Sequence, residues 1–291
     1  MSTNFGINLS FAVKRWVEPE AWAKLVAEDM DLQLVQFSFD LLDPWWEDEL
    51  GKPLAKRVQQ AASDHNLSIH SAFVGLAAYT YNALLHPVDE ARTAAITWFK
   101  RAIERATDMG APAVGGPVGA VSPGIDDMEP HYARLLETLG DLCNYAKACG
   151  LEAYYIEPTP LTREIPWSVD QAQKLVSDMA GSAVPIKYAI DLGHALYQPL
   201  YGDAAAFEPW LALGDHIGLI HLQQTDGQSD SHWGFTREGI VDPAKVAAAM
   251  ARAGVNVPLI LEVFYPFELA DDAVYADVTQ SVAYCKQVLE L

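Results

Sequence analysis

The segment IKYAIDLGH, residues 186–194, is the stretch that decides the fold. It is a short, nearly continuous apolar run that ends in Asp191, with His194 three residues later. A run of this length is typical of a strand buried on both faces, as in a parallel sheet. The preceding segment, 168–180, has helical spacing instead. The sequence around Asp191 therefore predicts a helix followed by a buried parallel strand.

The same alternation extends along the whole chain. Seven further apolar runs predict strands: NFGINLSFA (4–12), LQLVQFSFD (32–40), LSIHSAFVG (67–75), APAVGGPVG (111–119), LEAYYIEPT (151–159), IGLIHLQQT (217–225) and VPLILEVFY (257–265). Segments with helical spacing lie between them, and Gly110, Gly150 and Gly254 end three of these helices. Eight strands alternating with eight helices predict an α/β protein with a (β/α)8 TIM barrel, as one domain over residues 1–291. An open doubly wound sheet is the alternative, which the absence of GxGxxG after the first run disfavours.

Composition limits the classes of partner and compartment. The chain has 291 residues, with 19 basic and 39 acidic side chains and a formal net charge of −20. Such a surface repels phosphate backbones, so we expect no nucleic-acid partner. The N-terminus lacks a signal-peptide pattern, and no apolar run reaches the roughly 20 residues that cross a membrane. Three cysteines without a CxxC pair indicate reduced thiols, and we expect a cytoplasmic protein with no membrane partner.

Four consecutive predicted strands end in a carboxylate or an imidazole. Glu157 ends the fifth strand, Asp191 the sixth, His221 the seventh and Glu262 the eighth. Each residue alone has an ordinary structural explanation; Asp191, for example, would suit a turn cap. In a (β/α)8 barrel, however, these strand ends meet at the face that carries the chemistry. Together they predict a shared ligand.

This set of side chains favours a divalent metal ion. Two glutamates, one aspartate and one histidine offer hard oxygen ligands and one nitrogen, which suits Mn²⁺, Mg²⁺ or Co²⁺ and suits Zn²⁺ less well. Three carboxylates close together also need a nearby cation. We therefore expect Glu157, Asp191, His221 and Glu262 to bind one metal ion.

The motifs IEP, DLGH, IHLQQTD and LEVF, in this order, resemble those of the xylose isomerase-like TIM barrels, a family of sugar isomerases and epimerases. The resemblance covers essentially the whole chain, and its ketose 3-epimerase branch implies the metal role for Glu157, Asp191, His221 and Glu262. It also implies that Glu157 and Glu262 act as the acid–base pair on either side of a carbon next to a ketone, through an enediolate. The expected substrate is a ketose or a short-chain ketose phosphate. A homodimer or homotetramer is also implied.

Several further side chains are expected at the substrate. His194 matches a family histidine near the substrate carbonyl, with a turn residue as the alternative. The family arginine that follows the metal histidine is absent from QQTDGQSD, and Arg237 is the suggested replacement. The other expected substrate-binding residues are His70, Gln223, Asp230, His232, Trp16 and Trp45. Phe11, Trp46 and Trp167 join the two tryptophans as a possible aromatic lid, with a subunit interface as the alternative for Trp45 and Trp46. Lys14 and Arg15 are candidates for a phosphate group.

Other functions on the same barrel stay open. A lyase, such as an inosose dehydratase or a sugar-acid decarboxylase, would use the same metal and Glu157 but expel water or carbon dioxide. The apurinic endonucleases, which bind three zinc ions, have a histidine after the third strand and an Asp-x-His in the seventh loop, which His70, Asp230 and His232 match. The fourth predicted strand, however, lacks the histidine of that family, and the net charge is unfavourable for DNA. The nuclease is therefore the remote alternative, and a non-catalytic sugar-binding protein is disfavoured by the two glutamates.

Overall fold

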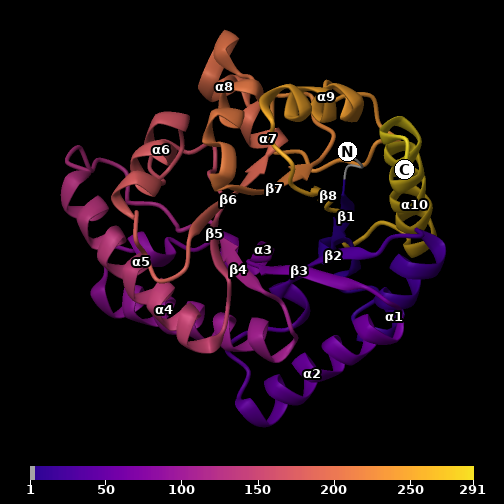
Figure 1. The fold of residues 1–291 in the computed structure, drawn as a ribbon, viewed down its shortest axis with the longest axis horizontal. Helices are drawn as coiled ribbons and strands as arrows, with labels where there is room; N and C mark the ends of the chain where they lie inside the picture. Colours follow the sequence, from indigo (N-terminus) through magenta and orange to yellow (C-terminus); the bar gives the residue numbers. More distant parts are fainter. Residues whose placement is uncertain (1–3) are drawn as a thin grey trace. The chain divides into compact units, whose positions relative to one another are not determined.

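A computed structural model describes residues 4–291, and its strands form a closed parallel barrel in sequence order (Figure 1). The strands are β1 (Phe5–Asn8), β2 (Leu34–Ser38), β3 (Ser68–Phe73), β4 (Ala113–Gly116), β5 (Ala153–Ile156), β6 (Ile186–Asp191), β7 (Ile217–Leu222) and β8 (Leu259–Leu261). All but a few of their residues are buried, as expected for a parallel sheet with helices on its outside. The predicted (β/α)8 barrel is therefore confirmed.

Helices follow the strands in the expected order. The longer ones are α1 (Pro19–Lys24), which continues as a π-helix over Leu25–Asp29, α2 (Asp48–Asp64), α4 (Asp89–Asp108), α5 (Glu129–Cys149), α6 (Val169–Asp178), α9 (Pro243–Ala253) and α10 (Asp271–Leu289). One-turn helices α3 (Leu76–Tyr79), α7 (Leu192–Ala195) and α8 (Gln198–Tyr201) and five 3₁₀ segments occupy connections: Leu9–Ala12, Phe39–Leu41, Ala83–Leu85, Gly202–Ala204 and Glu208–His216. No helix within residues 4–291 has the length and apolar character to span a membrane.

The connection from β6 to β7 differs from the expected single helix. It consists of α7, α8 and two 3₁₀ segments, Gly202–Ala204 and Glu208–His216. Pro199 and Pro209 occupy first-turn positions in two of these pieces, and Gly214 has a positive φ of 53° inside the last one. Proline cannot continue a helix that precedes it, and a left-handed residue interrupts one. The prolines and glycines therefore divide this connection into short turns.

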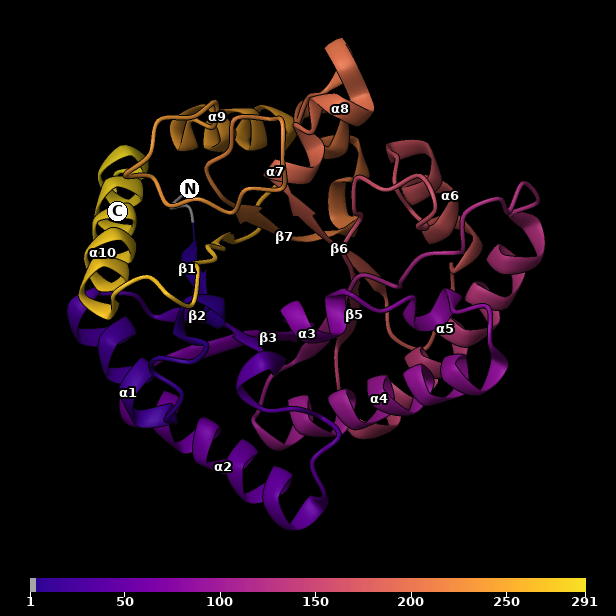
Figure 2. The same ribbon diagram turned by 180° about the vertical axis from the view of Figure 1, so that it is seen from behind.

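Backbone contacts divide the chain into two compact units. Residues 4–37, 60–68 and 190–291 form the first, which contains β1, β2, β7 and β8. In it β1 lies between β2 and β8, with Asn8 opposite Gln36 and Ile7 opposite Leu261. Helices α9 and α10 lie side by side in both ribbon views (Figure 2). The register of β1 and β2 thus brings the polar ends of two neighbouring strands together.

The second unit comprises residues 38–59 and 69–189. In it β4 lies between β3 and β5, and β5 pairs with β6. Helices α4 and α5 pack against one another and against β4 and β5, respectively. Glu157 follows the last residue of β5, so this unit delivers it at a strand end.

Candidate metal and active site

Three residues that were predicted as metal ligands come together in the first unit. Asp191 ends β6, His221 lies one residue before the end of β7, and Glu262 directly follows β8. Their exposed fractions are 1%, 0% and 5%, and a ligand atom of each lies within 4.8 Å of the others. The Nδ1 atom of His221 is 3.1 Å from Oε2 of Glu262. The barrel therefore gathers these ligand atoms in one buried place.

The two carboxylate oxygens of Asp191 have different surroundings. Its Oδ1 accepts hydrogen bonds from the backbone N–H of His194, in the first turn of α7, and from Nε2 of Gln223 at 2.8 Å. Its Oδ2 is buried and accepts no hydrogen bond from the described residues. An unsatisfied buried carboxylate oxygen is costly unless a cation is nearby. Asp191 is thus both the turn cap that its sequence allowed and an open ligand.

Two amide side chains hold the other ligands. The Oε1 atom of Gln36, on β2, lies 2.7 Å from Nε2 of His221. Asn8, the last residue of β1, donates from Nδ2 to Oε1 of Gln36 at 2.6 Å and to Oε1 of Glu262 at 2.8 Å. Sequence reasoning missed both residues, although each is a polar side chain inside an apolar run, in GINLS and LVQFS.

The donor set fits a divalent ion. Asp191, His221 and Glu262 supply two carboxylates and one imidazole, so that oxygen ligands are in the majority. Glu157, in the second unit, is 5% exposed and stays the predicted fourth ligand. The unsatisfied Oδ2 of Asp191 agrees with a missing cation partner. The residues present therefore suit one hard or borderline metal ion.

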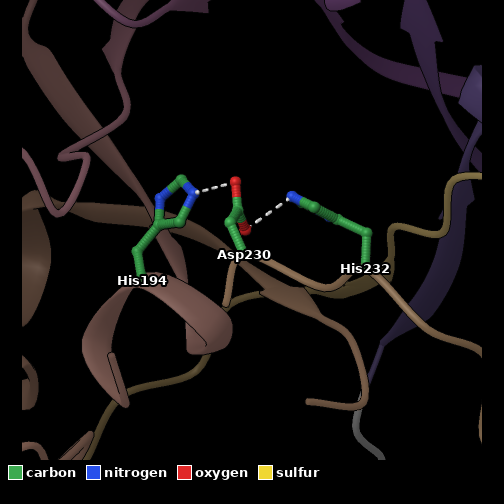
Figure 3. A group of neighbouring side chains, drawn as sticks. All are labelled: His194, Asp230 and His232. Atoms are coloured by element: carbon green, nitrogen blue, oxygen red, sulfur yellow. Dashed lines mark ion pairs between the residues drawn. The ribbon is translucent and has the colours of Figure 1, made fainter. Parts of the chain in front are cut away.

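A second group of titratable side chains lies in the same unit (Figure 3). Asp230 stands between two imidazoles: its Oδ2 is 3.3 Å from Nε2 of His194, and its Oδ1 is 3.0 Å from Nε2 of His232. The Nδ1 atom of His232 is 3.6 Å from Oε2 of Glu262. The three residues expected from DLGH and from Asp-x-His thus converge, next to a predicted metal ligand. They too could hold a metal ion.

Charge, more than burial, sets the protonation of this second group. Burial raises the pKa of Asp230, but the neighbouring His194 and His232 outweigh it and hold that pKa well below its ordinary value. Burial lowers the pKa of His232, but the carboxylates of Asp230, Asp191 and Glu262 outweigh it and raise that pKa to about 9. Without a metal ion, Asp230 and His232 therefore form an ion pair at neutral pH.

Gln223 connects the two groups. Its amide nitrogen donates to Asp191, and its amide oxygen accepts from the backbone N–H of His232. Its side chain is fully buried and packs over Gly193, where an added Cβ would lie 2.5 Å from the amide nitrogen. Direct binding of a substrate by Gln223 stays a prediction, whereas its link between Asp191 and the Asp230–His232 loop is a structural fact.

The other predicted contacts are more scattered. Arg237 is exposed, with its guanidinium 5.2 Å from the Trp233 ring. In the second unit, Nδ1 of His70 lies 3.2 Å from the Ser71 hydroxyl, and Trp45 borders a mainly apolar cavity of about 350 Å³. That cavity is also lined by Trp98 and Phe99, and none of the metal-ligand candidates borders it.

The residues of the first loop have structural partners. Phe11 is 1% exposed and therefore belongs to the core, not to an exposed aromatic lid; the Trp16 ring lies 6.0 Å from it. Arg15 donates to the carbonyls of Pro266, Phe267 and Leu269 and pairs with Asp271. Its guanidinium is thus engaged by the β8–α10 loop, which argues against a role in binding a phosphate group.

A family comparison agrees with this arrangement. A family model described as the xylose isomerase-like TIM barrel matches residues 25–279. The chain belongs to the xylose isomerase-like TIM barrel family. The resemblance stated from the strand-end motifs is therefore confirmed for the family as a whole.

Three relatives resemble the chain over nearly its whole length. A crystal structure from Rhodospirillum rubrum, whose assignment as a xylose isomerase is provisional, is 39% identical, with a TM-score of 0.94 over 98% of this chain and 99% of the other. The D-erythrulose 1-phosphate 3-epimerase of Brucella abortus is 23% identical over 98% of this chain and 96% of its own. The D-psicose 3-epimerase of Clostridium cellulolyticum H10 is 13% identical, with a TM-score of 0.76 over 99% of this chain and 100% of its own, and supports the fold.

Proposed function

We propose that the protein is a metal-dependent sugar epimerase that acts on a ketose or a short-chain ketose phosphate. The observation that carries the proposal is the buried group of Asp191, His221 and Glu262 at the ends of β6, β7 and β8, to which we add Glu157, at the end of β5, as the proposed fourth ligand. The relative from Brucella abortus, named as an epimerase of a ketose phosphate, supports the same class of reaction. The expected ion is Mn²⁺, Mg²⁺ or Co²⁺, with Zn²⁺ as an alternative.

The reaction requires a proton to leave a carbon beside a ketone and another to return on the opposite face. Glu157 and Glu262 are the proposed acid–base pair, because each is a buried carboxylate that can take or give a proton. A divalent ion at this site would stabilise the negative charge that develops on the substrate oxygens. Asn8 holds Oε1 of Glu262 by a hydrogen bond, and we assign the proton transfer to the other oxygen, Oε2.

The second group is proposed to hold the rest of the substrate. The imidazoles of His194 and His232 and the carboxylate of Asp230 offer donors and an acceptor for sugar hydroxyls. His232 could instead contact a phosphate group, because its positive charge is retained at neutral pH. Since Arg15 is occupied by backbone carbonyls, an unphosphorylated sugar is slightly favoured. Oligomerisation as a homodimer or homotetramer, and a cytoplasmic location, stay predictions.

Solvent exchange tests the proposal directly. The protein, loaded with Mn²⁺ or Co²⁺, is incubated in D₂O with a panel of ketoses and ketose phosphates and then removed before NMR. We expect deuterium at one carbon next to the ketone, together with the epimer of at least one panel member. The absence of exchange and of any product with every sugar would refute the epimerase proposal. Release of water or carbon dioxide would instead identify a lyase on the same barrel.

A further inference from the structure

We infer that Asn8 and Gln36 are positioning residues for the metal ligands: they orient Glu262 and hold His221 in the one tautomer whose unprotonated Nδ1 faces Oε2 of Glu262. The inference rests on the metal site of the proposed function and adds to it two residues outside the ligand set. Both residues are buried, with exposed fractions of 2% and 0%, and they lie opposite one another in the β1–β2 register. They therefore form a fixed polar layer, by which we mean the hydrogen-bonded pair of Asn8 and Gln36, next to the ligands.

The direction of every hydrogen bond in this layer follows from one backbone group. The N–H of Ser10 can only donate, and it lies 2.8 Å from one end of the Asn8 amide, which must therefore be oxygen. The other end of that amide is the NH₂ group, which donates to Oε1 of Glu262. A carboxylate only accepts, so this second contact independently gives the same orientation of Asn8.

The orientation of Asn8 then determines the state of His221. The NH₂ group of Asn8 also lies 2.6 Å from the Gln36 amide, so the atom of Gln36 that it meets must be the oxygen. This oxygen is 2.7 Å from Nε2 of His221. Because an amide oxygen only accepts, Nε2 must carry the proton.

The remaining ring nitrogen, Nδ1, is thereby the one that would bind a metal ion. With Nε2 protonated, the lone pair of a neutral His221 sits on Nδ1, which faces Oε2 of Glu262 at 3.1 Å. Two acceptors at this distance repel one another unless a cation or a proton lies between them. A partner that fixes the far nitrogen of a metal-binding histidine commonly orients the ring and tunes the metal affinity. Asn8 and Gln36 thus prepare His221 and Glu262 for one shared ion.

A matched pair of substitutions tests the role of Gln36. Gln36→Leu removes the acceptor, whereas Gln36→Glu retains an oxygen that can accept from His221. We expect Gln36→Leu to weaken Co²⁺ binding about 10- to 100-fold in titration calorimetry and to alter the visible spectrum of bound Co²⁺. Gln36→Glu should bind Co²⁺ close to the wild-type affinity. Equal affinity in all three proteins, or equal loss in both variants, would overturn the inference.

NMR of the wild-type protein reports the tautomer of His221 itself, without a change to Asn8 or Gln36. Proton–nitrogen correlation spectra of the imidazoles, with the His221 signals assigned by comparison with His221→Asn, report which ring nitrogen is protonated. We expect a protonated Nε2 in both the metal-free and the Zn²⁺-loaded protein. An unprotonated Nε2 in the metal-free protein would overturn the inference. If the wild type binds no metal ion at all, the proposed metal site fails, whereas this spectrum still decides the hydrogen-bond pattern.

Discussion

Three side chains of the site converge on Glu262. Asn8 donates to its Oε1, while its Oε2 faces Nδ1 of His221 at 3.1 Å and Nδ1 of His232 at 3.6 Å. One oxygen is thus held by a neutral amide, and the other faces the potential metal ligand and the second group. Because Oε1 is held by a hydrogen bond, the carboxylate can keep its position while Oε2 exchanges a proton.

The Glu262→Gln substitution separates proton transfer from metal binding. Glutamine keeps the shape and one oxygen, but it cannot act as a base. We expect turnover of the ketose found in the D₂O panel to fall about 10²- to 10⁴-fold, while a part of the metal affinity remains. Steady-state kinetics and metal titration check the two effects. Glu268→Gln, at an exposed position on the loop that follows, is the matched control; wild-type turnover in Glu262→Gln would remove this residue from the acid–base pair.

The sequence could predict the four metal-ligand candidates because parallel strands deliver their last residues to one end of a barrel. It could not single out Asn8 and Gln36, since amide side chains occur in many strands for structural reasons alone. Their role depends on the register that places them opposite one another. The contact of His194 with Asp230 depends on the path of a loop, in which His232 adopts a positive φ of 45°. Such a path is set by tertiary packing and not by local pattern.

At the scale of elements, Arg15 ties the β1–α1 loop to the loop between β8 and α10. Its side chain is 4% exposed, and it reaches three backbone carbonyls as well as Asp271. Hydrogen bonds from a charged donor stabilise more than neutral ones do. The sequence suggested Arg15 only as a cation for phosphate, because nothing local indicates that carbonyls 251 and 252 residues away will surround it.

Arg15→Ala should therefore loosen the β8–α10 loop. We expect the amide of Leu269, which donates to the carbonyl of Pro266, to exchange its hydrogen about tenfold faster or more. Hydrogen–deuterium exchange measured by mass spectrometry on peptides from residues 263–275 checks this. Lys14→Ala is the control, because Lys14 is exposed and its ammonium lies over the Phe267 ring of the same loop. Equal exchange in the two variants would contradict the conclusion that Arg15 holds the β8–α10 loop in place.

Strands β5 and β6 offer a matched pair of buried tyrosines. The Tyr188 hydroxyl donates to the carbonyl of Ala172 at 2.8 Å, which joins β6 to α6. The Tyr154 hydroxyl, on β5, is equally buried and has no hydrogen-bond partner among residues 4–291. Only the first hydroxyl therefore contributes a hydrogen bond to the packing of an element.

Tyr188→Phe and Tyr154→Phe should change stability in different directions. The first should lower the free energy of unfolding by about 1 kcal/mol, the usual net value of a hydrogen bond. The second should leave it unchanged or raise it by up to about 1 kcal/mol, because it removes a buried polar group without a partner. Urea denaturation of both variants and the wild type measures the difference. An equal loss in the two variants would mean that the Tyr154 hydroxyl is satisfied in solution.

For the whole molecule, buried phenol and thiol groups with raised pKa values make the free energy of unfolding depend on pH in the alkaline range. Burial raises the pKa of Tyr155 from 10.0 to about 12, with a smaller contribution from Glu152. Burial likewise raises the pKa of the Cys143 thiol from 9.0 to about 12, partly opposed by Ser182. Both groups are neutral when protonated, so the folded protein retains protons that the unfolded chain releases first. The cause is the apolar surroundings of both groups, which disfavour a charged phenolate or thiolate.

The free energy of unfolding should therefore fall as the pH rises above about 9 to 10. Below that range both states bind these protons, and the stabilisation is fully present; it is lost as the pH rises towards the folded-state pKa of about 12. Each group contributes a slope of about 1.4 kcal/mol per pH unit between its unfolded and folded pKa. Urea denaturation at several pH values between about 8 and 11 measures the slope.

Repulsion within a chain of net charge −20 also grows with pH, so the decisive quantity is a difference between variants. Tyr155→Phe removes the titrating group but keeps the ring in the barrel, and its stability should fall less steeply with pH than that of the wild type. Tyr284→Phe, at a position 42% exposed, is the control. If the wild type and Tyr155→Phe lose stability in parallel up to pH 11, the Tyr155 phenol does not couple to folding, and the alkaline loss must come from general charge repulsion.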